Sequence, residues 1–453
     1  MFKKLLIIML LVIGTVLLLP LISTSGIQKV LDERIADLQT HGLHITQEDQ
    51  GSSYFTTKQH YEFSLEDPVA FSNYLQSGSA AEIPPYVQVL LDDVIMGMDL
   101  SYSNLLISDD IVIDLYPIAL NTAATQRMQD EDAVLYKEMQ EMLQNREFMY
   151  HMEYDIAAEK FKGKIIDIDR TLHFADGRVA KILFDSAHIK GKGSLMKPEE
   201  MELKVQKAEL NFDLEGQAKM RFSLEGLKSD SHFKEKDDFE VKYAAKALYF
   251  YFENPKQMMD LHASDMKSRS QMQKREGKLH TKFDVKVKTA SLKDKVNAIA
   301  IEGLEFDMDA KDLDEVAFDA FNEAQKKAGA SSQYTMLAGV GLLSKGLSLD
   351  IEAFKIKKIT INDSKAMDGF DHKIDVKIVA DDKLVQKMQM TPLALMQNVT
   401  IDAKLRFSQE FYGYINQDDT MIMLNSFAKK SSDEVIFEIE LQDNKLKVND
   451  HQL

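Results

Sequence analysis

From about residue 43 onward, apolar and polar side chains alternate along much of the chain, which is the pattern of β-strands with one buried face. The clearest run is 210–214, where Leu, Phe and Leu are separated by Asn and Asp, and a second run at 218–224 follows Gly216. Comparable stripes lie at 150–156, 283–287, 304–308, 349–351, 374–378, 399–407 and 435–441. The pattern therefore predicts a protein that is mainly β.

Turn residues stand between these runs where hairpins require them. Asp176-Gly177 is a signal for a tight type I′ turn, and Asp443-Asn444 is a weaker form of it. Ser108-Asp109-Asp110 separates two short apolar runs in the same way. An antiparallel meander without a strict repeat is expected.

Several segments have helical spacing instead. Amphipathic helices are predicted at 26–40, 129–147, 256–272 and 311–329. Asp67-Pro68 should cap and open another helix, with Phe71, Tyr74 and Leu75 on one side. The small-residue segment 328–346 is expected to be a hinge or loop. The predicted fold class is α+β, mainly β, with long curved antiparallel sheet and amphipathic helical insertions after one transmembrane helix.

These patterns divide the chain into five parts. They are a membrane anchor at 1–25, an N-terminal α+β region at 26–148, an antiparallel β-sheet region at 149–310, a helix and hinge at 311–345, and a C-terminal β region at 346–453.

The anchor is predicted from an uncharged apolar run from Leu5 to Ile22, preceded by Lys3 and Lys4. As a helix this run would be about 27 Å long, close to the hydrocarbon thickness of a bilayer. Because positive charge stays in the cytoplasm, the rest of the chain should be exported. The expected location is the bacterial inner membrane, single-pass, with the bulk periplasmic. A signal peptide cleaved near Ser23 is the alternative.

Composition narrows the possible partners. The chain has a formal net charge of −18 and contains no Cys. Such an acidic protein repels phosphate backbones, so nucleic acid is not expected as a partner. The lack of Cys removes disulfides, thiolate metal sites, lipoprotein attachment and cysteine nucleophiles.

Candidate metal chemistry is sparse. His151 lies two residues from Glu153 on a predicted strand whose polar face also carries Asp155, and a solvated face is the simpler interpretation. Asp167 and Asp169 resemble the start of a calcium loop, but the Gly and the final Glu of that loop are missing. No metal ligand is therefore assigned.

Catalytic and nucleotide-binding motifs are equally weak. Gly339-Val340-Gly341 does not continue as a dinucleotide-binding sequence, because Ser344 occupies the third glycine position. Ser264 and Lys267 satisfy a short Ser-x-x-Lys pattern without its companion motifs. We assign no catalytic residue and no cofactor, and we expect that the protein is not an enzyme.

The methionines have two interpretations. Met258, Met259, Met266 and Met272 cluster in one segment, while Met388 and Met390 flank Gln389. Met adapts its shape and lines apolar grooves, but it also fills cores in a chain without Trp or Cys. The core interpretation is the simpler one.

The chain resembles the YdgA-like family of bacterial envelope proteins, largely of unknown function. The resemblance rests on the N-terminal order of basic residues, apolar span and amphipathic helix, followed by Gly51 and the residues Tyr54, Phe55, Thr56 and Thr57. The amphipathic helix at 311–329 and a terminal hairpin also match, although Lys445 and Asp450 follow Asn444 and Asn449 where the family tends to have glycines. The resemblance implies a single-span inner-membrane protein facing the periplasm. Long amphipathic sheets anchored in this way are similar to AsmA-like envelope proteins, which are linked to lipid movement.

Two functions follow from the predicted sheet. The first is binding or guiding of lipid or another apolar ligand along an apolar sheet face, with Phe212 and Phe222 as representative contact residues. The alternative is a structural or scaffolding envelope protein with no ligand, whose apolar faces are dry cores or contacts with an envelope protein partner. An open apolar face favours the first hypothesis, and closed packing favours the second.

Overall fold

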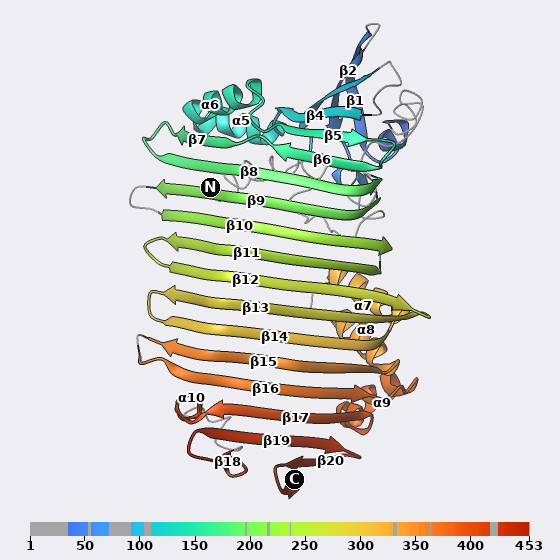
Figure 1. Ribbon diagram of the computed structural model, residues 1–453, viewed down its shortest axis with the longest axis vertical. Coiled ribbons are helices and arrows are strands. Elements are labelled where there is room, and N and C mark those ends of the chain that lie inside the picture. The colour runs from blue at the N-terminus through green and yellow to red at the C-terminus, as the bar shows by residue number, and fades with distance from the viewer. Residues whose placement is uncertain are drawn as a thin grey trace. The chain divides into compact units, whose positions relative to one another are not determined.

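The protein is mainly β, with large antiparallel sheet and few helices (Figure 1). The computed structural model describes residues 35–52, 56–71, 92–103, 110–194, 197–214, 218–235, 237–328, 333–362, 364–416 and 425–452. Within these ranges, no helix has the length and apolar character needed to cross a membrane. The predicted anchor at 5–22 lies outside the described residues.

The chain forms two compact units. Unit 1 comprises Met1–Lys236 and Leu248–Met258, and unit 2 comprises Asp237–Ala247 and Met259–Leu453. The strand β11 (Asp238–Glu253) contributes residues to both.

Unit 1 is an antiparallel meander in which nearly every strand pairs with the next one in sequence. The exception is β8, which is long enough to pair with β6 through one half and with β7 through the other. The strands are β1 (Leu43–Ser52), β2 (Thr56–Leu65), β3 (Ile95–Ser103), β4 (Asp110–Ala119), β5 (Tyr150–Asp155), β6 (Lys160–Ile165), β7 (Ile168–His173), β8 (Val179–Ser194), β9 (Lys197–Leu214) and β10 (Ala218–Glu235).

The apolar face of unit 1 is covered by helices and by neighbouring strands. Helix α6 (Ala133–Gln144) follows α5 (Thr122–Glu131) and buries Leu135, Met139, Met142 and Leu143, as the spacing at 129–147 predicts. These side chains join one continuous core with residues of β1 to β10. The apolar stripes near α6 are therefore packed, whereas most apolar residues of β9 and β10 are half-buried.

The predicted Asp67 cap of unit 1 is confirmed, whereas the Asp176-Gly177 turn is right in place but wrong in type. Asp176-Gly177 lies in the β7–β8 hairpin, but only Gly177 has a positive φ, 84°, and a type I′ turn needs positive φ at both central residues. The carboxylate of Asp67 accepts the backbone N–H groups of Val69 and Ala70 at 3.1 and 2.9 Å, so it caps the helical turn that begins at Pro68. Of the predicted apolar side of that helix, Phe71 is buried, while Tyr74 and Leu75 lie outside the described residues.

Unit 2 continues the antiparallel pattern from β12 to β17, and β19 then pairs with β17, β18 and β20. Its strands are β12 (Met258–Arg275), β13 (Lys278–Asp294), β14 (Ala298–Asp314), β15 (Leu347–Ile361), β16 (Met367–Ile378), β17 (Val399–Ser408), β18 (Lys429–Lys430), β19 (Glu434–Gln442), β20 (Lys445–Val448) and β21 (His451–Gln452). Its helices are α7 (Glu315–Ala328), α8 (Gln333–Ser344), α9 (Leu384–Met390), the 3₁₀-helix η1 (Pro392–Gln397) and α10 (Gln409–Ile415).

The predicted helix at 256–272 is wrong, because this segment forms most of strand β12. Asn254 and Pro255 instead belong to the preceding turn, in which the Asn254 side chain accepts the N–H groups of Lys256 and Gln257 at 2.8 and 2.6 Å. The expected loop at 328–346 is also wrong over most of its length, because α8 occupies it and packs on α7. Helix α7 begins at Glu315 rather than 311, since β14 extends to Asp314.

The Asp443-Asn444 turn is confirmed. Both residues have positive φ values, 51° and 60°, and they join β19 to β20 as a two-residue hairpin loop.

A residue with a left-handed backbone conformation recurs at nearly constant spacing in the long strands. Ser186 in β8, Gly226 in β10, Asp265 in β12 and Gly303 in β14 have left-handed φ values of 53°, 62°, 47° and 66°. We call them the kink residues, and they occur at intervals of 40, 39 and 38 residues. The cross-strand register omits each of them, although pairing continues on both sides.

The kinks keep apolar side chains on one face. In β8, the residues that belong to the core are even-numbered up to Phe184 and odd-numbered from Ala187, yet Ile182, Ala187 and Ile189 are all buried in the same core. The partner strand β9 also leaves one residue, Gln206, out of the pairing at this point, so both strands change their alternation together and the register is kept. Each long strand can therefore run past its kink without turning its apolar side to the charged face.

Candidate ligand-binding face

A row of aromatic side chains crosses the apolar face of unit 2 from β13 to β19. Neighbouring ring centroids lie 4.5–6.2 Å apart. We call this row the aromatic ladder, and its members are Phe283, Phe306, Phe354, Phe370, His372, Phe407 and Phe437. The strand register explains the alignment, because Phe306 is opposite Phe354 and Phe354 is opposite His372. Residues that are paired in this way share one face of a sheet.

Helices cover the two ends of this face. At one end, α7 and α8 pack Phe318, Phe321 and Leu342 on strand residues that include Leu279 and Leu313. At the other end, α10 places Phe411 5.9 Å from Phe370 and Tyr412 5.8 Å from Phe437. Phe306 and Phe354, between the two covers, remain only half-buried.

Large apolar side chains on this face reach solvent. Met259 is 40% exposed, Phe283 37%, Leu292 44% and Ile299 45%, and Tyr243 in the unit 2 part of β11 is 49% exposed. In unit 1, by contrast, the corresponding stripes of β8 are buried. The face of unit 2 is thus apolar and partly open, the arrangement that a ligand or a partner would cover.

His372 is a polar group inside the aromatic ladder. Its ring stacks on Phe370 at 4.5 Å with an interplanar angle of 16°, and Phe354 and Phe407 contact it edge-on. Its Nδ1 atom is buried and has no hydrogen-bond partner within the described residues. This burial lowers the pKa of His372, although the backbone and charge of Asp371 oppose the effect. The ring is therefore held in its neutral, largely apolar form.

The opposite face of unit 2 is charged. Its most unusual feature is a row of carboxylates directly opposite one another on successive strands, which comprises Asp309, Asp350, Asp375, Asp402 and Glu440. Lys311 lies between the first two, 3.3 Å from Asp309 and 2.9 Å from Asp350. A hydrogen bond with Lys311 lowers the pKa of Asp350, whereas the neighbouring Asp350 raises the pKa of Asp375. Close carboxylates disfavour each other's ionisation, which is the cause of the raised pKa of Asp375.

This carboxylate row does not form a metal centre. Within the part of the chain that the structure describes, no group of three or more His, Asp and Glu side chains converges to hold an ion. The carboxylates follow one another across the strands of the sheet, and the spacing of the strands prevents them from converging on one ion.

The residues considered for a metal site near His151 make polar contacts with their neighbours instead. His151 Nδ1 lies 2.7 Å from Asp114 Oδ1, and its Nε2 lies 3.8 Å from Glu153. The alternation in β5 places His151, Glu153 and Asp155 on the face opposite Tyr150 and Tyr154, as predicted. They are part of the charged face of unit 1.

Other sequence candidates also have structural roles. The side chain of Asp167 accepts the N–H of Ser186 at 2.8 Å, and Asp169 lies 3.7 Å from Lys181. Ser264 shares a hydrogen bond with Thr289 across two strands, and Lys267 stands on the charged face of β12.

The remaining candidates are parts of secondary structure. Gly339-Val340-Gly341 lies inside helix α8, so it is no phosphate-binding loop. Met258, Met259, Met266 and Met272 lie on a strand, where Met272 packs against the core beneath α7. Met388 and Met390 belong to the short helix α9.

The two representative contact residues of the predicted groove are placed differently from the expectation. Phe212 packs against the unit 1 core and contacts Phe174 edge-on at 5.5 Å. Phe222 is its close neighbour across the β9–β10 pair, opposite Leu210. Both side chains are half-buried, and the more exposed apolar side chains of the long strands lie in unit 2.

Sequence reasoning identified the stripes at 283–287 and 304–308 but not the aromatic ladder. The ladder is a property of register among strands that are up to about 150 residues apart, and the sequence contains no local signal for it.

Comparison with protein-family models, with curated proteins and with solved structures found no match to this chain.

Proposed function

We propose that the protein binds the hydrocarbon part of a lipid, or a similarly apolar ligand, on the apolar face of unit 2. The single observation that carries the proposal is the set of large apolar side chains left between 37% and 49% exposed on this face. A monomeric protein rarely leaves a large apolar surface in water without something to cover it.

Binding of this kind needs no catalytic group. An acyl chain lying along the aromatic ladder would contact ring edges and β-branched side chains on one side and solvent on the other. Full burial stabilises each methylene by about 0.8 kcal/mol, so half-burial of about ten methylenes contributes about 4 kcal/mol before ordering costs. This supports weak, exchangeable binding, which suits a protein that holds or guides lipids.

The cellular setting is part of the same proposal. The apolar run at 5–22 would anchor the chain in the bacterial inner membrane and leave the β units in the periplasm. A lipid-handling face would then lie in the aqueous envelope, where apolar molecules need a carrier.

Photo-crosslinking tests the proposal with a control that the strand itself provides. Phe283 is on the apolar face and Asp284, the next residue, is on the charged face. A benzophenone amino acid is introduced at each position in turn, the cells are irradiated, and the adducts are identified by mass spectrometry. Lipid adducts at Phe283 and none at Asp284 are expected.

Two results would contradict the proposal. Equal lipid labelling at both positions would show contact without a binding face. Protein adducts at Phe283, with no lipid, would favour the alternative of a scaffold whose apolar face docks on an envelope protein. The closed core of unit 1 is the observation that keeps this second function in view.

A further inference from the structure

Helix α8 carries no charge on any side. None of its residues, Gln333–Ser344, is charged, in a chain of which 28% of the residues are. One side of the helix packs on α7, where a Cβ on Gly339 would lie 3.4 Å from the Phe321 ring and the Thr335 hydroxyl donates to the Ala324 carbonyl at 3.2 Å. A helix without a polar face is normally buried on all sides.

The other side of α8 nevertheless reaches solvent. Tyr334 is 63% exposed, Met336 66% and Leu337 40%, while Val340 and Gly341 are partly exposed. A Cβ on Gly341 would have no neighbour within 4 Å among the described residues. At about 100° per residue, these five positions fall on one half of the helix. We call this half the outer face of α8.

The outer face adjoins the apolar sheet face of unit 2. Together with α7, helix α8 covers Leu279 and Leu313 at one end of β13 and β14 (Figure 1). At the C-terminal end of α8, the Ser344 carbonyl accepts the N–H of Asp381 at 2.8 Å, and the nearby Val379 is 56% exposed. Apolar side chains therefore reach solvent from more than one element at this end of the unit.

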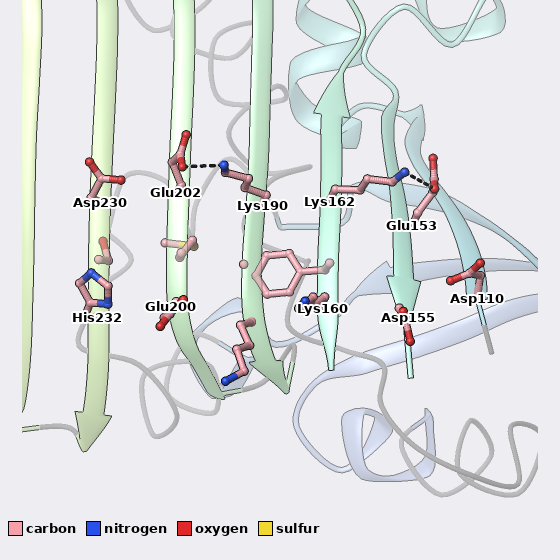
Figure 2. A pocket seen from close by; sticks show the side chains of 15 residues that line it. Asp110, Glu153, Asp155, Lys160, Lys162, Lys190, Glu200, Glu202, Asp230 and His232 are labelled. Carbon is pink, nitrogen blue, oxygen red and sulfur yellow. Dashed lines mark ion pairs between the residues drawn. The ribbon is translucent and has the colours of Figure 1, made fainter. Parts of the chain in front are cut away.

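The charged surfaces of the protein are satisfied in a way that α8 is not. A hollow of about 610 Å³ lies on the charged face of unit 1. Within it, Lys162 pairs with Glu153 at 2.8 Å and Lys190 pairs with Glu202 at 2.9 Å (Figure 2). Such a surface is well solvated and needs no cover. The outer face of α8 has no charged group with which to do the same.

The size of the outer face is too small for a stable contact with a second copy or another protein. Such an interface needs about 800 Å² from each partner. A helix about 18 Å long with three well-exposed side chains offers roughly a few hundred Å². It also supplies no charged residue for the polar rim that surrounds protein interfaces.

A lipid bilayer is a cover that fits this face. Apolar side chains of a surface helix enter the boundary between headgroups and acyl chains one by one, and Tyr is favoured at that depth. Attraction to anionic headgroups is not involved, because Lys345 beside α8 pairs with Asp382 at 3.0 Å, and Asp319 and Glu323 are exposed on α7. The contact would therefore depend on insertion of apolar groups alone.

We propose that the outer face of α8 inserts into the surface of a lipid bilayer and holds this end of unit 2 at the membrane. The inference rests on the proposed function, since a lipid-binding face needs contact with the membrane that supplies the lipid. The apolar run at 5–22 would anchor the chain in the same membrane, and this tether raises the effective concentration of α8 at the surface. Weak insertion of a few side chains is then sufficient.

Site-specific fluorescence tests the contact, because the chain contains no Cys. Met336→Cys is labelled with a nitrobenzoxadiazole group, and the full-length protein is reconstituted in phosphatidylcholine vesicles with or without a nitroxide on the upper part of the lipid acyl chain. Val296→Cys is the matched control, since Val296 is an apolar residue of unit 2 that is 82% exposed in the turn at the other end of β13 and β14. The nitroxide should lower the emission about twofold at position 336 and leave it unchanged at position 296.

Every outcome of this measurement decides the inference. Quenching at position 336 should persist at high salt, because no charge pair is involved. Loss of the quenching in salt, or equal quenching at position 296, would overturn the proposal. Absence of quenching at position 336 would overturn it too, and a blue-shifted emission in that case would show that protein covers α8.

A second readout separates this inference from the proposed function. Met336→Glu with Leu337→Glu, in protein that carries benzophenone at Phe283, should lower the yield of lipid adducts severalfold, because the glutamates resist insertion. Val296→Glu should leave the yield unchanged, and all three side chains are exposed, so both proteins should fold. Absence of adducts in the parent would contradict lipid binding on the sheet, while the quenching would still test the membrane contact. Equal yields from the parent and the double variant would overturn the role of α8 alone.

Discussion

Truncation of Phe354 tests whether the aromatic ladder stabilises unit 2. The Phe354 ring lies at the centre of the ladder, 5.8 Å from Phe306, 5.0 Å from Phe370 and 6.0 Å from His372. Replacement by Ala removes all three contacts and leaves a gap beneath half-exposed neighbours.

The expected loss follows from this geometry. A fully buried Phe→Ala change costs about 3–5 kcal/mol, and each aromatic pair contributes about 0.5–1.5 kcal/mol beyond area burial. Because Phe354 is only half-buried and its gap can fill with water, we expect a decrease in the free energy of unfolding of about 2–3 kcal/mol. With a slope of about 2–3 kcal/mol per molar urea, the midpoint should fall by about 1 M.

Circular dichroism in urea measures the midpoint, and hydrogen exchange assigns the change. Amides of β14, β15 and β16 should lose protection, whereas those of unit 1 should not. Tyr334→Ala is the matched control, since Tyr334 is an aromatic residue of unit 2 that is 63% exposed on α8, and it should cost less than about 0.5 kcal/mol. Equal effects of the two substitutions would refute the view that the ladder is a stabilising cluster.

Three further predictions concern single residues. The lowered pKa of His372 means that the unfolded state binds its proton more readily, so unfolding free energy should fall as pH decreases below about 6.5, by at most about 1.4 kcal/mol per pH unit. His372→Phe should remove that part of the pH dependence in urea titrations, and an unchanged slope would contradict the assignment. Gly369→Ala should destabilise unit 2 by more than about 2 kcal/mol, because the new Cβ would lie 2.2 Å from the Ile356 carbonyl oxygen. A thermal midpoint within about 1–2 °C of the parent would show that the backbone moves to make room for the methyl group. Asp132→Ala should cost about 2–3 kcal/mol, because its carboxylate accepts two N–H groups at 3.0 Å, one capping α6 and one from Ala175, and proteolysis near α6 should accelerate correspondingly.

The parts of the fold that depend on local chemistry could be predicted from the sequence. Strands with strict alternation, the places of the Asp176-Gly177 and Asp443-Asn444 turns, and the Asp67 cap all depend on residues within a few positions of each other. In each case the side chain or the backbone preference that decides the structure is visible in the sequence itself.

The error at 256–272 has a physical cause in the kink at Asp265. Apolar residues two apart, Leu261 and Ala263, are followed by Met266 three positions later, because the left-handed residue Asp265 shifts the alternation. Spacings of two and three together resemble a helical period, although pairing with β13 holds the segment as a strand. A local pattern cannot distinguish an interrupted strand from a weak helix.

The candidate ligand-binding face could not be predicted in this way either. Which stripe is covered depends on where helices return to the sheet, and α6, α7 and α10 cover different strands for reasons of tertiary packing. The stripe around Phe212 and that around Phe283 look alike in sequence, yet only the first packs into an extensive core. Openness is a property of the assembled unit.

The kink residues also define how such a sheet can change in width. They recur on every second strand from β8 to β14, so the repeating module is a pair of strands and not one strand. Gain or loss of a whole pair would return the chain to the same edge, pointing in the same direction, with its kink on a strand of the same direction as the other kinked strands. Gain or loss of one strand would reverse every later strand and move each kink to a strand of opposite direction. Length variation in proteins built on this plan should therefore proceed in steps of about 40 residues.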